Sequence, residues 1–175
     1  MHILFICTGN ICRSPTAERL AAAYAARHGV FDVTTSSAGT RAVIGHPIHQ
    51  DAARVLDPMG ADTANFAARQ FTLKIATKAD LVIAMTREHR DVVLETAPRQ
   101  LRRTFTLIEA ARLTTEFGAL TISDLAALRP RLAANEPLDI PDPIGQSPEV
   151  FAAVGSQIAG LLPPIIELCR RTITA

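Results

Sequence analysis

The sequence predicts an α/β protein with an open four-stranded parallel sheet and helices on both faces. Three observations support this fold. Short apolar runs alternate along the chain with stretches of helical periodicity. The first run, ILFI, is continuously apolar, which is typical of a strand covered on both faces. Helix-starting and helix-stopping residues separate the runs, as expected for parallel strands joined by crossover helices.

Each expected element has a start and a stop in the sequence. Strands are expected at residues 2–6, 33–38, 81–85 and 104–108, where apolar and β-branched residues gather. Helices are expected at 14–28, 50–56, 86–96, 109–117 and 123–134 and from 148 onward, with a further helical stretch, LKIATKA, before the third strand. Ser14, Thr86 and Ser147 are the expected N-caps, and Pro15 and Pro148 suit the first helical position, which needs no N–H. All 175 residues are expected to form one domain, 1–175.

Charge and composition exclude several classes of partner. The 18 Lys and Arg and 17 Asp and Glu are interspersed, so neither nucleic acid nor an anionic membrane is expected to bind. The N-terminal apolar run is too short to span a membrane and lacks signal-peptide features, and Pro163-Pro164 interrupts the apolar C-terminal stretch. Three unevenly spaced cysteines indicate reduced thiols. A soluble, cytoplasmic protein is therefore expected.

The segment CTGNICRSP, residues 7–15, lies between the first strand and the first helix. A helix N-terminus presents unpaired N–H groups and the positive end of the helix dipole, so a loop entering it is a ready seat for an anion. Gly9 and Asn10 tolerate backbone angles closed to most residues, which lets the loop curl its N–H groups around a small tetrahedral oxyanion. Arg13 adds a planar fork suited to two phosphate oxygens.

Cys7 supplies a nucleophile to this seat. A cysteine at a helix N-terminus beside an arginine ionises at lower pH than a free thiol, so a thiolate is expected at neutral pH. The loop amides and Arg13 can hold the equatorial oxygens of phosphorus while the thiolate attacks in line. Ser14 is expected to cap the helix and to donate its hydroxyl to the sulfur, which helps the sulfur leave when the phosphocysteine is hydrolysed.

Two other interpretations of the cysteines stay open on the residues alone. A cysteine at the end of a buried strand is commonly a small inert hydrophobe, although the strand, Gly-Asn, Arg and Ser-Pro in sequence favour the nucleophile. Cys7 and Cys12 could also bind a metal, but the five histidines show no zinc spacing and Cys169 stands alone. The sequence therefore predicts no metal and no other cofactor.

The same residues resemble the low-molecular-weight protein tyrosine phosphatases, whose signature is C-x-x-x-x-x-R-S. The resemblance extends to SAG at 37–39, ADLVIAMT at 79–86 and DP at 142–143, in this order along the chain. It implies a fold of four parallel strands with helices on both sides. It also implies a two-step phosphatase mechanism that needs no metal.

The family resemblance implies a role for each matching residue. Cys7 attacks phosphorus, and Asp142, on a loop braced by Pro143, protonates the leaving oxygen and later activates water. Asn10 and Ser37 pin the phosphate-binding loop. The residues that bind the phosphoryl group are Arg13 and the loop residues Thr8, Gly9, Asn10, Ile11, Cys12 and Ser14.

Two assignments within this resemblance carry alternatives. Asp139, three residues before Asp142, is the second choice for the acid, and a loop carboxylate or helix cap is its structural reading. Cys12 resembles the second thiol of the family, which forms a reversible disulfide with the nucleophile. Such a bond would switch off Cys7 and shield it from irreversible oxidation, whereas a packing role is the alternative for Cys12.

The sequence departs from the tyrosine-directed members at the walls of the substrate pocket. Ile144 follows the Asp-Pro pair where many members have an aromatic residue, and the loop RAVIGHP, 41–47, has none. Phe66 stands where many members have histidine, and the only tyrosine, Tyr24, falls in the first helix. These differences leave the phosphoryl chemistry intact and leave the preference for phosphotyrosine open. The stretch 114–137 could supply a different wall.

Two rival functions are consistent with parts of the pattern. An arsenate reductase of the same fold has a similar loop, but it usually needs a mobile resolving cysteine or an external thiol, and only Cys169 lies downstream. A non-catalytic phosphate-binding regulator would need neither the thiolate of Cys7 nor the acid Asp142. The expected partners are a phosphorylated protein or small phosphomonoester and, by resemblance, a cognate tyrosine kinase system.

Overall fold

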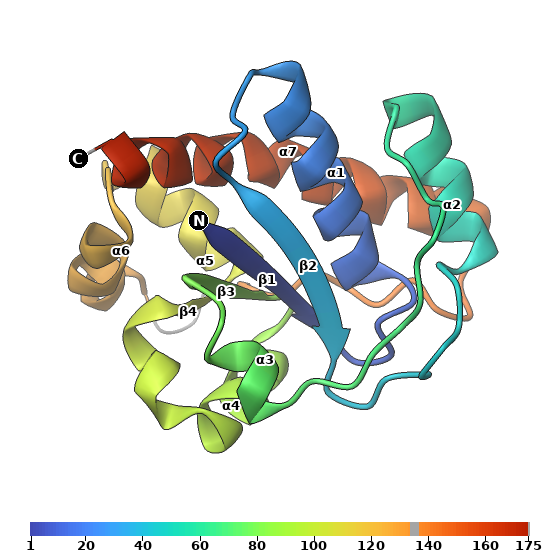
Figure 1. Cartoon of the computed structure of the whole chain (residues 1–175), viewed down its shortest axis with the longest axis horizontal. Helices are drawn as coiled ribbons and strands as arrows, with labels where there is room; N and C mark the ends of the chain where they lie inside the picture. The colour runs from blue at the N-terminus through green and yellow to red at the C-terminus, as the bar shows by residue number, and fades with distance from the viewer. Residues whose placement is uncertain (134–136, 175) are drawn as a thin grey trace.

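The computed structural model describes residues 1–133 and 137–174, and its sheet has the expected topology. The four strands are parallel and lie in the order β2-β1-β3-β4 (Figure 1). Their bounds are β1 His2–Cys7, β2 Thr34–Gly39, β3 Leu81–Ala84 and β4 Thr104–Thr106. Strand β1 lies inside the sheet and ends at Cys7. Cys7 is thus at the carboxyl edge, where such sheets bind their ligands.

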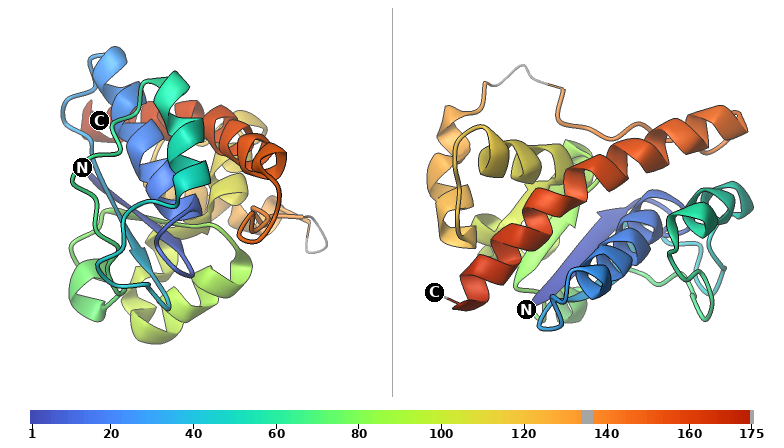
Figure 2. Two further views of the ribbon diagram at one scale, coloured as in Figure 1. Left: turned by 90° about the vertical axis from the view of Figure 1, so that its right-hand side faces the viewer. Right: turned by 90° about the horizontal axis from the view of Figure 1, so that it is seen from above.

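Helices cover both faces of the sheet, as Figures 1 and 2 show. Helices α1, α5 and α7 lie on one face together with α2 and α6, and the short helix α3 and α4 lie on the other. The α-helices are α1 Arg13–Arg27, α2 Gln50–Leu56, α3 Leu73–Ala76, α4 Arg87–Thr96, α5 Leu107–Thr115, α6 Ile122–Leu128 and α7 Pro148–Thr174. Short 3₁₀ turns are η1 Asp57–Met59, η2 Pro98–Arg103 and η3 Arg129–Arg131.

Strand β1 divides the core into two layers. Ile3 and Phe5 pack against the layer of α1 and α7, whereas Leu4 and Ile6 pack against the layer of α3 and α4. Successive residues of a strand point to opposite faces, and helices cover both faces of this sheet. All four side chains are therefore fully buried. This double burial explains the continuous apolar run in the sequence.

Several predicted boundaries differ from the structure, and two of them have a clear physical reason. Helix α1 begins at Arg13, its N-cap position is Cys12, and the Ser14 hydroxyl contacts the Cys7 sulfur instead of capping the helix. Strand β4 ends at Thr106, so residues 107 and 108 belong to α5. The physical reason is a capping box, in which Thr106 and Glu109 satisfy each other's backbone N–H groups and start the helix there.

The helix predicted at 50–56 is α2 with the same bounds, and the other predicted helices are present. Thr86 caps α4 as expected, since its hydroxyl accepts from the backbone N–H of His89. The helix expected at 123–134 is α6, which stops at Leu128, and Pro130 lies in the following 3₁₀ turn. Ala134 lies outside the described residues.

The last helix is the longest element of the chain. Within the described residues, Pro148–Ile173 is the one helix long and apolar enough to cross a membrane by length and composition. In the structure α7 packs on α1, α2 and α5, and its side chains Ile158, Leu162 and Ile166 are buried in the core beneath the sheet. Its apolar composition is thus accounted for by the core it forms with α1 and α5.

Candidate active site

The loop between β1 and α1 is shaped by Asn10. Its backbone has φ 55°, in the left-handed region, and its side chain is completely buried. Gly9, which was also expected to adopt unusual angles, is not among the residues of positive φ in the described part of the chain. Asparagine tolerates this conformation better than most residues, so the turn depends on Asn10.

The carbonyl groups of the loop are tied to the segment that follows β2. Cys7 O, Thr8 O, Gly9 O and Ile11 O accept from the backbone N–H groups of residues 40, 41, 43 and 49, at 2.9, 3.0, 2.9 and 2.7 Å. The N–H of a trans peptide points away from the preceding carbonyl. The amides of residues 8, 9, 10 and 12 therefore point away from this segment, as an anion-binding loop requires.

The sulfur of Cys7 lies at the end of a buried hydrogen-bond network. The Cys7 side chain is 2% exposed, and its Sγ is 3.0 Å from Ser14 Oγ. Asn10 Nδ2 donates to Ser14 Oγ at 3.0 Å and to Ser37 Oγ at 2.8 Å. Ser37, 27 residues further along the chain, thus reaches the phosphate-binding loop through Asn10.

Arg13 and Asp142 face each other across the mouth of the loop. The Arg13 side chain is 5% exposed, and its Nη2 donates to Asp142 Oδ2 at 2.5 Å while Nη1 donates to Ile140 O at 3.1 Å. The backbone N–H of Ile144 donates to the other oxygen, Oδ1, at 3.1 Å. The Asp142 side chain keeps 47% of its surface exposed, so water and ligands can reach the carboxyl.

Asp139, the second choice for the acid, has a different position. Its carboxylate accepts from the backbone N–H of Arg87 at 2.7 Å and pairs with the Arg87 guanidinium, at the start of α4. Asp139 does not line the pocket that contains Cys7. The structure therefore favours its reading as a carboxylate that anchors α4.

His89 is a site residue that sequence reasoning missed. Its Nε2 is 2.8 Å from Thr8 Oγ1 and its Nδ1 is 2.8 Å from Thr86 Oγ1, so both ring nitrogens have a hydroxyl partner. Burial, with the nearby Arg13 guanidinium, lowers the pKa of His89 to about 4. A neutral imidazole thus holds the first loop residue from α4, and no local sequence pattern connects positions 81 residues apart.

Burial dominates the surroundings of the other two thiols. Burial first, and then the Cys7 sulfur, raise the pKa of Cys12 to about 12, and burial raises that of Cys169 to about 12. All three cysteines are unpaired. Within 1–133 and 137–174, no group of three His, Cys, Asp or Glu side chains could hold a metal ion.

A pocket of about 240 Å³ opens over the loop. Of the expected loop residues, Asn10 and Ser14 are buried beneath the loop and do not line the pocket. The lining residues are Cys7, Thr8, Gly9, Ile11, Cys12 and Arg13 together with Arg41, Val43, Asp142 and Ile144. Its walls are aliphatic, formed by Ile11, Val43 and Ile144, in agreement with the lack of aromatic residues in the sequence. None of the described residues of 114–137 lines it.

A parallel α/β sheet with a cysteine and an arginine in an anion-binding loop at its carboxyl edge is the arrangement expected of a cysteine-dependent phosphatase. The family model described as "Low molecular weight phosphotyrosine protein phosphatase" matches residues 2–118. The chain belongs to this family.

Individual relatives support the same family. Low molecular weight protein-tyrosine phosphatase A of Mycobacterium tuberculosis is 35% identical over 167 residues, covering 92% of this chain and 89% of the relative. The structure of a low molecular weight protein tyrosine phosphatase from T. tengcongensis is similar with a TM-score of 0.76, 30% identity, and coverage of 95% and 98%. The YwlE arginine phosphatase from Geobacillus stearothermophilus is similar with a TM-score of 0.73, 29% identity, and coverage of 95% and 90%. The chain is therefore a low-molecular-weight phosphatase by sequence and by fold.

Proposed function

We propose that this phosphatase removes the phosphoryl group of phosphotyrosine in proteins through a phosphocysteine at Cys7. The observation that supports this most directly is that Cys7, Arg13 and Asp142 line the same pocket over the loop. The names of the relatives agree with phosphotyrosine as substrate.

In the first step the Cys7 thiolate attacks phosphorus and the bond from phosphorus to the leaving oxygen breaks. Arg13 and the loop amides hold the equatorial oxygens, and Asp142 gives its proton to the departing oxygen. The Arg13–Asp142 ion pair has a function here. A bound phosphoryl group takes over the guanidinium, which releases the Asp142 carboxyl from this ion pair and frees it to face the leaving oxygen.

In the second step water attacks phosphorus and the bond from phosphorus to sulfur breaks. Asp142, now a carboxylate, takes a proton from the attacking water. The Ser14 hydroxyl, 3.0 Å from Sγ, donates to the departing thiolate. The step returns Cys7 as a thiolate and Asp142 as an acid, ready for the next substrate.

The walls of the pocket favour an aryl phosphate over an arginine phosphate. Ile11, Val43 and Ile144 present an aliphatic surface on which an aromatic ring can bury itself. Arg41, which lines the same pocket, would repel the cationic guanidinium of phosphoarginine. The similarity to an arginine phosphatase nevertheless makes phosphoarginine the comparison that the assay must include.

The test measures turnover of matched peptides that carry phosphotyrosine, phosphoarginine or phosphoserine. An aryl phosphate and sugar phosphates are assayed as further substrates. We expect the highest kcat/KM for phosphotyrosine, loss of turnover in Cys7→Ser, and a strong decrease in Asp142→Asn. Thiol-dependent reduction of arsenate with negligible phosphatase rate would support the reductase instead. Phosphate binding without turnover would support a regulator.

We propose further that 1–175 acts as one phosphatase unit in the cytoplasm and that it opposes a cognate tyrosine kinase. Three relatives named protein-tyrosine phosphatases support the protein substrate, although none of their names identifies a kinase. Phosphoproteomics of a deletion strain would test this, since phosphotyrosine sites should rise in occupancy when the enzyme is absent.

A further inference from the structure

A second pocket adjoins the pocket over the phosphate-binding loop, which is called the catalytic pocket below. The second pocket has a volume of about 310 Å³ and lies between the segment after β2 and the first two turns of α4. Thr8 and Arg41 line both pockets, so the two meet at these side chains. The other lining residues are Thr40, Glu88, His89 and Val92. A substrate in the catalytic pocket thus has a neighbouring cavity that no step of the proposed chemistry uses.

Arg41 brings an unpaired positive charge to the second pocket. It is exposed, and among the residues that the structure describes its guanidinium has neither an ion pair nor a hydrogen bond. A guanidinium presents several N–H donors in one plane, which match the two oxygens of a carboxylate. Arg41 is therefore free to bind an anionic group that enters this pocket.

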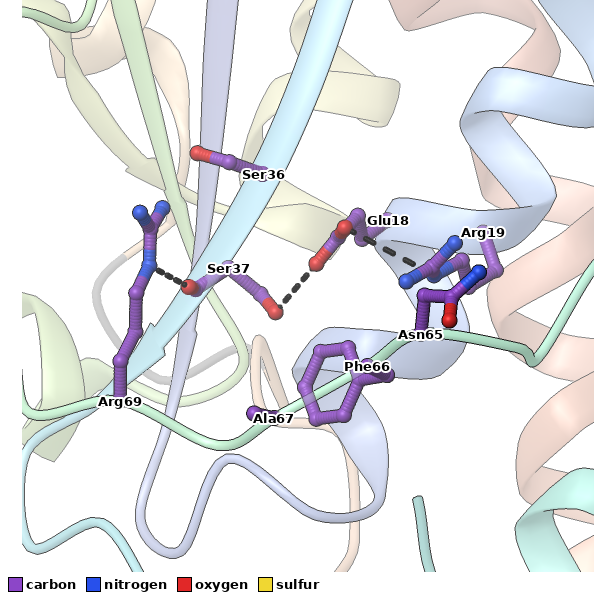
Figure 3. A pocket seen from close by; sticks show the side chains of 8 residues that line it. All are labelled: Glu18, Arg19, Ser36, Ser37, Asn65, Phe66, Ala67 and Arg69. Atoms are coloured by element: carbon purple, nitrogen blue, oxygen red, sulfur yellow. Dashed lines mark hydrogen bonds and ion pairs between the residues drawn. The ribbon is translucent and has the colours of Figure 1, made fainter. Parts of the chain in front are cut away.

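The arginines of a third pocket differ in this respect. Figure 3 shows that pocket, which lies between α1, β2 and residues 65–69 and is lined by Arg19 and Arg69. Arg69 Nε donates to the carbonyl of Ser37 at 2.8 Å, and Arg19 forms an ion pair with Glu18 at 3.7 Å, as the dashed lines mark. The described residues that line it include none of those that line the catalytic pocket. The second pocket is therefore the better placed of the two to contact a substrate.

Glu88, the acidic residue of the second pocket, has a structural reason for its charge. It lies in the first turn of α4, where the positive end of the helix dipole stabilises a carboxylate. Glu88 and Arg41 line the same pocket, yet in the described part of the chain they form no ion pair with each other. The charge of Glu88 is thus accounted for by the helix, whereas the charge of Arg41 has no partner in the fold.

Thr8 can add a hydrogen-bond donor beside Arg41. Thr86 Oγ1 accepts the backbone N–H of His89, and within residues 1–133 and 137–174 its own proton has no acceptor other than His89 Nδ1. When Thr86 donates to Nδ1, the neutral imidazole carries its proton on Nε2 and donates it to Thr8 Oγ1 at 2.8 Å. In this tautomer the hydroxyl proton of Thr8 is left for a group in the pocket.

We propose that the second pocket is a subsite for an acidic residue of the protein substrate, next to the phosphotyrosine, whose carboxylate accepts from Arg41 and Thr8. The proposal rests on the proposed function, since it takes phosphotyrosine in a protein as the substrate. An aspartate or glutamate close to the phosphotyrosine in sequence can reach the subsite, because the two pockets meet at these same side chains. Glu88 limits the preference, since it repels the same carboxylate.

The two charges of the subsite predict opposite effects on specificity. Arg41→Gln removes the attraction and leaves the repulsion by Glu88, so an acidic neighbour should no longer favour turnover. Glu88→Gln removes the repulsion, so the preference for an acidic neighbour should increase. A subsite for a basic residue would give the reverse signs, because Glu88 would then supply the attraction and Arg41 the repulsion.

The experiment compares phosphotyrosine peptides of one sequence that carry aspartate, asparagine or lysine at a single position, taken in turn from the two positions on each side of the phosphotyrosine. At one position or more we expect kcat/KM of the wild type to be roughly three- to fivefold higher for aspartate than for asparagine, as for a partly exposed ion pair, and lower for lysine. Arg41→Gln should bring the ratio of aspartate to asparagine to about one or below, and Glu88→Gln should raise it roughly twofold. Arg99→Gln removes an exposed arginine from a pocket between α3 and η2 and is the matched control, which should leave the ratio unchanged.

Peptide binding separates the subsite from the chemistry. Dissociation constants of the same peptides are measured by calorimetry for Cys7→Ala, which lacks the proposed nucleophile, alone and combined with Arg41→Gln. They should show the same order of preference as kcat/KM. Thermal unfolding checks that each variant folds, and Arg41→Met replaces Arg41→Gln under the same criteria if the latter does not fold.

Three results would overturn the subsite: equal dissociation constants for aspartate and asparagine at every position, tighter binding of the lysine peptides, or a preference for aspartate that persists in Arg41→Gln. Absence of turnover of every peptide, with the dissociation constants as expected, would overturn the proposed function and leave the subsite standing. The failure of one proposal is therefore distinguishable from the failure of the other.

Discussion

His89 is expected to make the stability of the protein depend on pH in a defined window. Its pKa is lowered from 6.5 to about 4 in the folded chain, because burial and the Arg13 guanidinium disfavour the imidazolium. The folded protein therefore binds fewer protons than the unfolded chain between these two values. The contribution of neutral His89 is complete above pH 6.5 and is lost as the pH falls towards 4.

The magnitude follows from the same two values. A difference of roughly 2.5 pKa units corresponds to about 3 kcal/mol once the pH is below both, and to about 2 kcal/mol between pH 7.5 and pH 5. The groups that act on the imidazole are Arg13 and Arg41, which disfavour its charge, and Asp142 and Asp139, which favour it. Carboxylates elsewhere also titrate, so a variant at position 89 must serve as the reference.

The assay is urea unfolding of the wild type and of His89→Gln at pH 7.5, 6.5, 5.5 and 5, values chosen to span the window. Glutamine can keep bonds to the Thr8 and Thr86 hydroxyls but cannot take a proton in this range. We expect the wild type to lose about 2 kcal/mol more than the variant over this range. Parallel stability curves for the two proteins would refute a buried neutral imidazole.

Three further predictions concern the loop, the acid and a buried charge cluster. In Gly39→Ala, the new Cβ would lie 2.4 Å from Thr8 O, so the loop must shift and turnover should fall at least about tenfold, whereas Gly160→Ala meets nothing within 4 Å and should leave turnover unchanged. Asp142→Asn should lower kcat roughly 10²- to 10⁴-fold for a poor leaving group and much less for a good one such as p-nitrophenolate, as steady-state kinetics can measure; equal losses would contradict its role as acid. Glu109→Leu strips a carboxylate that is 2% exposed and 2.9 Å from Arg129 Nε, and should cost about 3–5 kcal/mol of unfolding free energy in urea, whereas a cost below about 1 kcal/mol would contradict this.

The phosphate-binding loop could be read from the sequence because its information is local. Cys7, Asn10, Arg13 and Ser14 lie within eight consecutive positions, and the structure brings them together as a strand end, a left-handed turn and a helix start. The alternation of apolar runs likewise specified the sheet, since β1 and β3 are buried on both faces. The predicted open parallel sheet of four strands was confirmed, and the structure adds the strand order β2-β1-β3-β4.

The supporting residues could not be read in the same way. His89 reaches the loop through a side-chain hydrogen bond from α4, and it has no pattern that distinguishes it from an ordinary helical residue. The start of α5 was different, because the capping box T-x-x-E at 106–109 was present in the sequence and would have ended the fourth strand correctly. At Ser14, a strong N-cap preference gave way to a contact with the sulfur.

The most direct test of the account is to trap the covalent intermediate. The enzyme is mixed with a saturating aryl phosphate, quenched with acid within one turnover, digested and examined by mass spectrometry under conditions that preserve thiophosphate bonds. The account predicts one phosphoryl group on the peptide that contains Cys7. Wild-type enzyme that is quenched before substrate is added is the control and should carry none. Burst release of the aryl alcohol with no phosphoryl group on Cys7 would contradict it.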